Sequence, residues 1–73
     1  MTAVAEANER IENLRQAISL VKHNAATSRQ MARDYPDSAD HYLADAEAAD
    51  MRLDHYEWRL AKLEEEFRHE RAA

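Results

Sequence analysis

Residues 35–40 read Tyr35-Pro36-Asp37-Ser38-Ala39-Asp40, and this stretch decides how the chain folds. The sequence has no glycine, and Pro36 is its only proline. A proline cannot donate a backbone hydrogen bond and disfavours helical dihedrals at the preceding residue, so a helix that reaches Tyr35 ends there. Asp37 or Ser38 is then placed to cap a second helix. We expect helices over about 3–33 and about 38–70, joined by a turn at 34–38.

Both expected helices carry apolar residues at alternating steps of three and four, the spacing of a left-handed coiled coil. The first stripe consists of Val4, Ala7, Ile11, Leu14, Ile18, Val21, Ala25, Ser28 and Ala32. The second consists of Tyr42, Ala46, Ala49, Leu53, Tyr56, Leu60, Leu63 and Phe67. If facing residues have numbers that add up to 74, small residues meet near the turn and large ones meet at the open end. The sequence therefore predicts an all-α fold, an antiparallel two-helix coiled-coil hairpin that makes one domain of residues 1–73.

The formal net charge of −5 is unevenly distributed along the chain. Residues 10–33 carry five basic side chains and one acidic one, whereas residues 34–57 carry eight acidic side chains and one basic one. This acidic balance disfavours direct nucleic-acid binding, which depends on cations that neutralise phosphates. We interpret the asymmetry as charge pairing between the two helices, worth about 0.3–0.5 kcal/mol for each exposed pair. The expected pairs are Lys22–Asp50, Arg15–Glu57 and Arg10–Glu66.

Composition also sets expectations about compartment and chemistry. The chain has no cysteine and no apolar run approaching the roughly 20 residues that cross a bilayer, so we expect a soluble, cytoplasmic protein without membrane contact.

Glu66 and His69 have the Glu-x-x-His spacing of di-iron bundles, but the apolar stripes carry no carboxylate before that final turn. We expect no metal site, no cofactor and no enzymatic activity, because no nucleophile–base pair or phosphate-binding loop is recognisable.

A second apolar stripe lies outside the predicted seam. In the second helix it comprises Ala44, Ala48, Met51, His55 and Trp58, and a weaker counterpart in the first helix comprises Ala17, Leu20, Thr27 and Met31. Trp58 occupies heptad position f, which points away from the partner helix, and an exposed tryptophan is a candidate interface residue. We predict a partner or dimer face formed by Leu20, Met31, Met51, His55 and Trp58. Three roles stay open: pairing of two hairpins into a four-helix bundle dimer, binding of a different protein, or a tryptophan that is merely exposed.

The turn resembles a known functional element. Tyr35, Pro36, Asp37 and Asp40 are similar to the aromatic-Pro-Asp-x-x-Asp tip of the coiled-coil hairpin in DksA-type transcription factors, and Gre-type factors have a similar acidic tip. The resemblance extends to Ala46-Glu47 and to the run of residues 59–64, and it covers the hairpin only, because the family's four-cysteine zinc finger has no counterpart here.

What the resemblance implies is a specific way of acting. Hairpins of this kind enter the secondary channel of bacterial RNA polymerase, where their tip carboxylates approach the catalytic magnesium. Tyr35, Asp37 and Asp40 would form the partner-binding tip. The expected function is a non-enzymatic regulator or inhibitor, a bacterial or phage factor acting on RNA polymerase. The alternative is a small self-associating helical adaptor or phage-type inhibitor with an acidic face, or a structural assembly component, acting through Met51 and Trp58.

Overall fold

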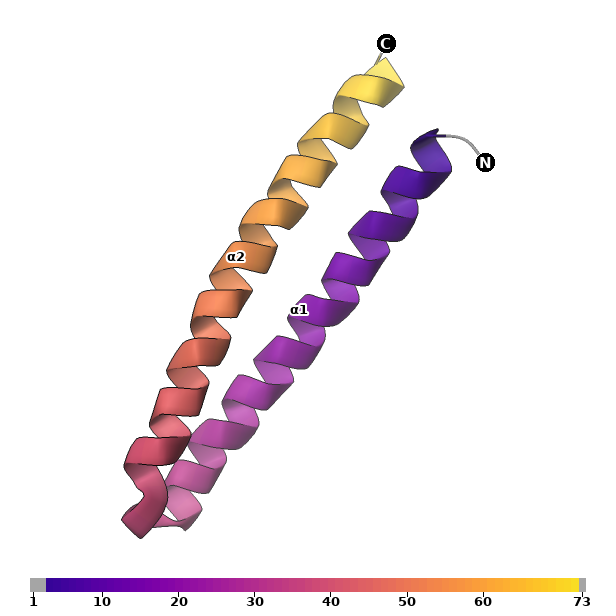
Figure 1. Ribbon diagram of the computed structural model, residues 1–73. Coiled ribbons are helices and arrows are strands. Elements are labelled where there is room, and N and C mark those ends of the chain that lie inside the picture. The colour runs from indigo at the N-terminus through magenta and orange to yellow at the C-terminus, as the bar shows by residue number, and fades with distance from the viewer. Residues whose placement is uncertain (1–2, 73) are drawn as a thin grey trace.

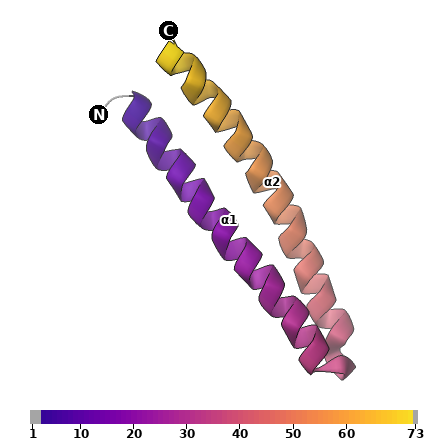
Figure 2. The same cartoon turned by 180° about the vertical axis from the view of Figure 1, so that it is seen from behind.

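The computed structural model describes residues 3–72, which form a helical hairpin (Figure 1). Helix α1 spans Ala3–Asp34, the 3₁₀ turn η1 spans Pro36–Ser38, and helix α2 spans Ala39–Ala72. The helices run antiparallel, so Ala3 and Ala72 lie at the end opposite the turn (Figures 1 and 2). The predicted all-α hairpin is thus confirmed, with helix ends within two residues of those expected.

The proline acts on the chain as the sequence predicts, but the second helix begins differently. Tyr35 leaves the helical region, with φ −126° and ψ 76°, while its N–H still donates to the Met31 carbonyl at 2.8 Å. The Ser38 N–H then donates to the Tyr35 carbonyl at 3.0 Å, and the Ala39 N–H donates to the carbonyl of Pro36. Among the described residues, neither Asp37 nor Ser38 contributes a side-chain cap, because these backbone bonds of η1 lead directly into α2.

The seam between the helices follows the predicted register. Ala25 and Ala49 pack with Val21, against which Leu53 and Tyr56 also pack. The buried residues are Ile11, Leu14, Ile18, Val21, Ala25, Ala32, Ala46 and Ala49, and the other predicted seam residues from Ala7 to Phe67 are half-buried. Val4 lies outside the residues whose side chains are described. No polar or charged side chain is buried in the described part of the chain, so the core is held by apolar contact alone.

Packing is tighter near the turn than at the open end. Ala46 and Ala49 are only 2% exposed, whereas Leu60, Leu63 and Phe67, farther along α2, are half-buried. Alanine lets helix axes approach closely, and larger side chains hold them apart, so the helices diverge towards their free ends in both views (Figures 1 and 2). The result is a tapered rod measuring 56 × 17 × 12 Å.

The ion pairs across the seam are not the predicted ones. Arg15 pairs with Glu64 at 3.6 Å instead of Glu57, and Asp50 pairs with Arg29 instead of Lys22. Within the described residues, Arg10 and Glu66 form no ion pair. The two rows of e positions do face each other, as expected. In each observed pair, however, one partner lies seven residues further along its helix than predicted: Glu64 replaces Glu57, and Arg29 replaces Lys22.

Side-chain direction explains this shift. Every Cα–Cβ bond in a helix tilts towards the N-terminus of that helix. Arg29 therefore tilts away from the turn, and Asp50, which lies farther from the turn on α2, tilts towards it, so the two side chains converge. Lys22 lies farther from the turn than Asp50, and the same tilt moves these two side chains apart.

Candidate protein-binding surfaces

The tip of the rod exposes the carboxylates of Asp37 and Asp40. Asp37 lies in η1 and Asp40 in the first turn of α2, and neither has an ion-pair partner in the part of the chain that the structure describes. The neighbouring Asp34 is occupied differently, because its carboxylate accepts a hydrogen bond from Gln30 at 3.0 Å. The structure thus places two unpaired anions at the narrow end of a long rod.

Aromatic side chains accompany these carboxylates. The exposed ring of Tyr35 lies 6.3 Å from the ring of Tyr42, centroid to centroid, and the His41 ring packs edge-on against Tyr42 at 5.5 Å. His41 also approaches the carboxylate of Asp45 at 3.5 Å. The predicted tip residue Tyr35 is therefore held by contact with α2 while keeping much of its surface free.

Leu43 is an exposed residue of the tip region that the sequence prediction missed. It is 48% exposed and lines a shallow hollow of about 350 Å³ together with Asp40, Arg29 and Glu47. The heptad contained a signal for it, because Leu43 occupies a flanking e position, where coiled coils usually carry a charge. An apolar side chain at such a position provides hydrophobic contact area beside the acidic tip.

The outer edge of α2 carries the largest exposed side chains. Met51 is 74% exposed and Trp58 is 60% exposed. The imidazole of His55 stacks on the Trp58 ring at 6.4 Å with an interplanar angle of 21°, and Lys62 Nζ lies 5.7 Å from the centre of that ring. The Trp58 ring therefore contacts both the His55 imidazole and the Lys62 ammonium group, and the latter is a cation–π contact.

The remaining members of the predicted face lie on α1. Leu20 is 61% exposed, whereas Met31 is half-buried near the turn. Their heptad positions, c and g, place them on one broad side of the hairpin, while Met51 and Trp58 occupy position f on the outer edge of α2. Leu20 and Met31 therefore lie on one broad side, Met51 and Trp58 lie on the outer edge of α2, and His55, at heptad position c of α2, connects the two. The joint face stays a prediction.

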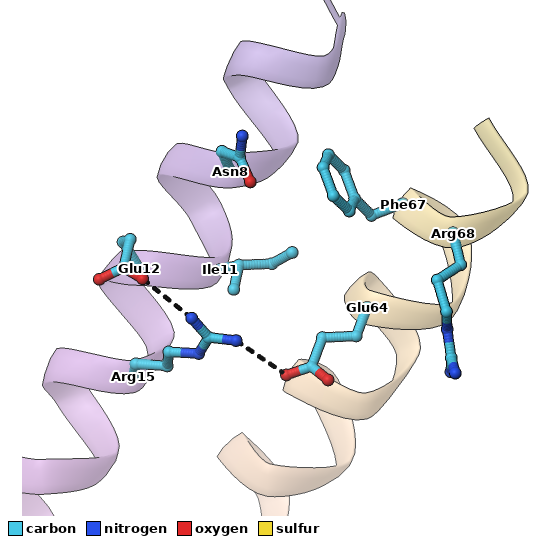
Figure 3. Close-up of a pocket in the computed structure, with 7 residues that line it drawn as sticks. All are labelled: Asn8, Ile11, Glu12, Arg15, Glu64, Phe67 and Arg68. Carbon is cyan, nitrogen blue, oxygen red and sulfur yellow. Dashed lines mark hydrogen bonds and ion pairs between the residues drawn. The ribbon is translucent and has the colours of Figure 1, made fainter. Parts of the chain in front are cut away.

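Ion pairs line a hollow at the open end of the hairpin (Figure 3). Arg15 of α1 lies between Glu12, at 3.0 Å, and Glu64 of α2, at 3.6 Å. Beside this network Ile11 and Phe67 point towards each other, and the hollow that they help to line measures about 300 Å³. The pairing of Arg15 with Glu64 links the diverging ends of the helices. Arg68 also lines this hollow, and it forms no ion pair within the described residues.

Known proteins offer no assignment for this chain: no family model, curated protein or solved structure matches it. Among residues 3–72, no group of three or more acidic or histidine side chains is arranged to hold a metal ion. None of the described helices combines the length and the hydrophobicity required to span a membrane.

Proposed function

We propose that this protein is a non-enzymatic regulator that inserts its hairpin tip into a deep channel of a larger enzyme, with bacterial RNA polymerase as the target. The tip residues Tyr35, Asp37 and Asp40 make the functional contact. The resemblance to the hairpin of DksA-type factors suggests the target, and the shape of the molecule supports the mode of action.

The observation that carries this proposal is the position of two unpaired carboxylates on a thin rod. The backbone extends 56 Å along the rod and only 17 × 12 Å across it, so the hairpin reaches into a channel that a globular domain of the same mass cannot enter. A bound divalent cation is the largest local charge in its site, so carboxylates brought close to it change the local electrostatics strongly. Asp37 and Asp40 are free to do so because neither is used in an ion pair within the described residues.

The test is multi-round transcription by purified bacterial RNA polymerase with and without the protein. We expect the wild-type chain to change transcript yield or transcript cleavage, and the variant Asp37→Asn/Asp40→Asn to have no effect. Both substitutions keep the side-chain volume and remove only charge, so circular dichroism should report the same helix content.

A matched control is Asp54→Asn/Glu57→Gln, which removes the same number of charges from exposed positions of α2 far from the tip. This control should retain the full effect. Equal activity of the tip variant and the wild type would contradict the proposal, and so would an equal loss in both variants, since this would indicate dependence on overall charge.

A further inference from the structure

The exposed surface of α1 has an unusual distribution of charge. Between residues 13 and 31 its only charged side chains are Arg15, Lys22 and Arg29, which all lie on the side that forms the observed ion pairs. The opposite broad side carries uncharged residues at steps of three and four: Asn13, Ala17, Leu20, Asn24, Thr27 and Met31. A strip of this kind, with an exposed leucine near its centre, is typical of a helix surface that packs against another helix.

A groove lies on this broad side towards the open end. It has a volume of about 330 Å³, and its apolar floor is formed by Leu14 and Leu63. Arg10 and Arg59 line the same groove, and neither guanidinium forms an ion pair within the described residues. Two like charges beside an apolar floor fit an occupant that combines an apolar side chain with carboxylates.

The broad side near the turn of the same chain offers this combination. Met31 lies there, with Asp34 one turn further along α1 and Asp45 facing them on α2. We propose that two copies of the chain pack through this broad side, with their tips at opposite ends, so that Met31 of each copy enters the groove of the other.

One two-fold axis, placed beside α1 midway between Leu20 and Asn24, satisfies all of these contacts. It brings Met31 of the second copy opposite Asn13 at the groove, and Asp34 of the second copy opposite Arg10. The same axis also brings Asp45 of the second copy opposite Arg59. Methionine suits this position because its flexible thioether adapts to an irregular apolar gap.

Two further contacts lie near the axis. Leu20 is covered there by the second copy. Arg52 meets its own counterpart, and this juxtaposition of like charges opposes the packing, in keeping with a dimer that forms only weakly. The product is a four-helix dimer in which the interface of each copy is the same surface, as two-fold symmetry requires.

Sedimentation equilibrium from about 10 µM to about 1 mM tests the dimer, since weak association is expected in that range. The mass of the wild type should rise with concentration from that of one chain to that of two. Leu20→Glu should stay monomeric, because it places a charge at the axis. Trp58→Glu is the matched control, since Trp58 is equally exposed but lies on the outer edge, and this variant should dimerise like the wild type.

A charge exchange tests the register. Arg10→Asp and Asp34→Arg should each weaken dimerisation at least tenfold, and the double variant Arg10→Asp/Asp34→Arg should restore it. Circular dichroism should report nearly the same helix content, because Arg10 has no ion pair to lose within the described residues and Asp34 loses only an exposed hydrogen bond from Gln30. A wild type that stays monomeric to 1 mM, a Leu20→Glu variant that dimerises normally, or a double variant without rescue would each overturn the proposal.

The dimer and the tip function can fail independently. Asp37 and Asp40 lie outside the contact surface, so Asp37→Asn/Asp40→Asn should dimerise normally. A monomeric wild type that still acts on transcription would overturn the dimer alone.

Discussion

At the scale of single residues, the direction of a side chain matters as much as its position in the heptad. Arg15 is at the correct flanking position for pairing with α2, but Glu57 and Glu64 are both in the facing row. The tilt of Cα–Cβ bonds towards each helix N-terminus selects Glu64. If each base is matched with the acid that lies opposite it in the register, the predicted partner is one heptad away from the observed one. If the tilt of the side chains is included, both observed ion pairs across the seam are predicted correctly.

Arg15 should be energetically coupled to Glu64 and not to Glu57. In a double-mutant cycle, Arg15→Gln with Glu64→Gln should give a coupling of about 0.2–1 kcal/mol in the free energy of unfolding, as expected for an exposed pair. The cycle of Arg15→Gln with Glu57→Gln should give a coupling near zero. Urea unfolding at low ionic strength measures both, and a larger coupling to Glu57 would contradict the side-chain tilt as the cause.

At the scale of the helices, alanine determines how closely α1 and α2 approach. Ala25, Ala46 and Ala49 are almost completely buried, and they occupy the half of the seam next to the turn. The open half contains leucine and aromatic residues of α2 that are only half-buried, such as Leu60, Leu63 and Phe67. The two halves of the seam are therefore stabilised differently, by close approach in one and by large side chains in the other.

The tight half should not tolerate a larger side chain. Ala49→Leu is expected to lower the free energy of unfolding by about 1–3 kcal/mol, because extra methyl groups between the helices force them apart. The same substitution at Ala61, which is exposed on α2, serves as the control and should change stability by less than about 0.5 kcal/mol. Thermal or urea unfolding would measure both, and equal stability of the two variants would show that the helices do not approach closely at Ala49.

At the scale of the whole molecule, the turn converts two helices into a rod with a defined tip. The tip and the broad side both exist only if the chain folds back on itself within one molecule. A continuous helix would place residues 9 and 65 roughly 84 Å apart, at about 1.5 Å per residue. In the hairpin these residues lie at the same level of the two helices.

Distance measurement between spin labels distinguishes these shapes. Glu9→Cys and Glu65→Cys introduce the only two thiols of the chain at exposed positions outside the groove. We expect a distance below about 40 Å, since packed helix axes lie about 8–10 Å apart and the labels add their own length. The labelled protein should be diluted with excess unlabelled chain to isolate intramolecular distances, and a dominant distance above about 70 Å would contradict the hairpin.

The sequence alone was sufficient to predict the two helices, the turn at Pro36 and the register of the seam. The helices and the turn depend on local chemistry, and the register depends on how the apolar stripes of the two helices fit each other. All three can therefore be derived without coordinates. Asp37 and Asp40 are singled out by the resemblance of the turn to the acidic tip of DksA-type hairpins, whereas their exposure follows from their position in and directly after a tight turn.

The tertiary structure decided which charges pair, where the rod widens and how the exposed residues are grouped. Arg15 and Arg29 each had more than one acid within the facing row, and only the relative placement of the helices distinguishes these acids. The groove beside Leu14 and Leu63 likewise depends on how far the helices diverge, because its width is set by the packing of many side chains together. Local patterns determine secondary structure and register, whereas distances between helices are a property of the assembled whole.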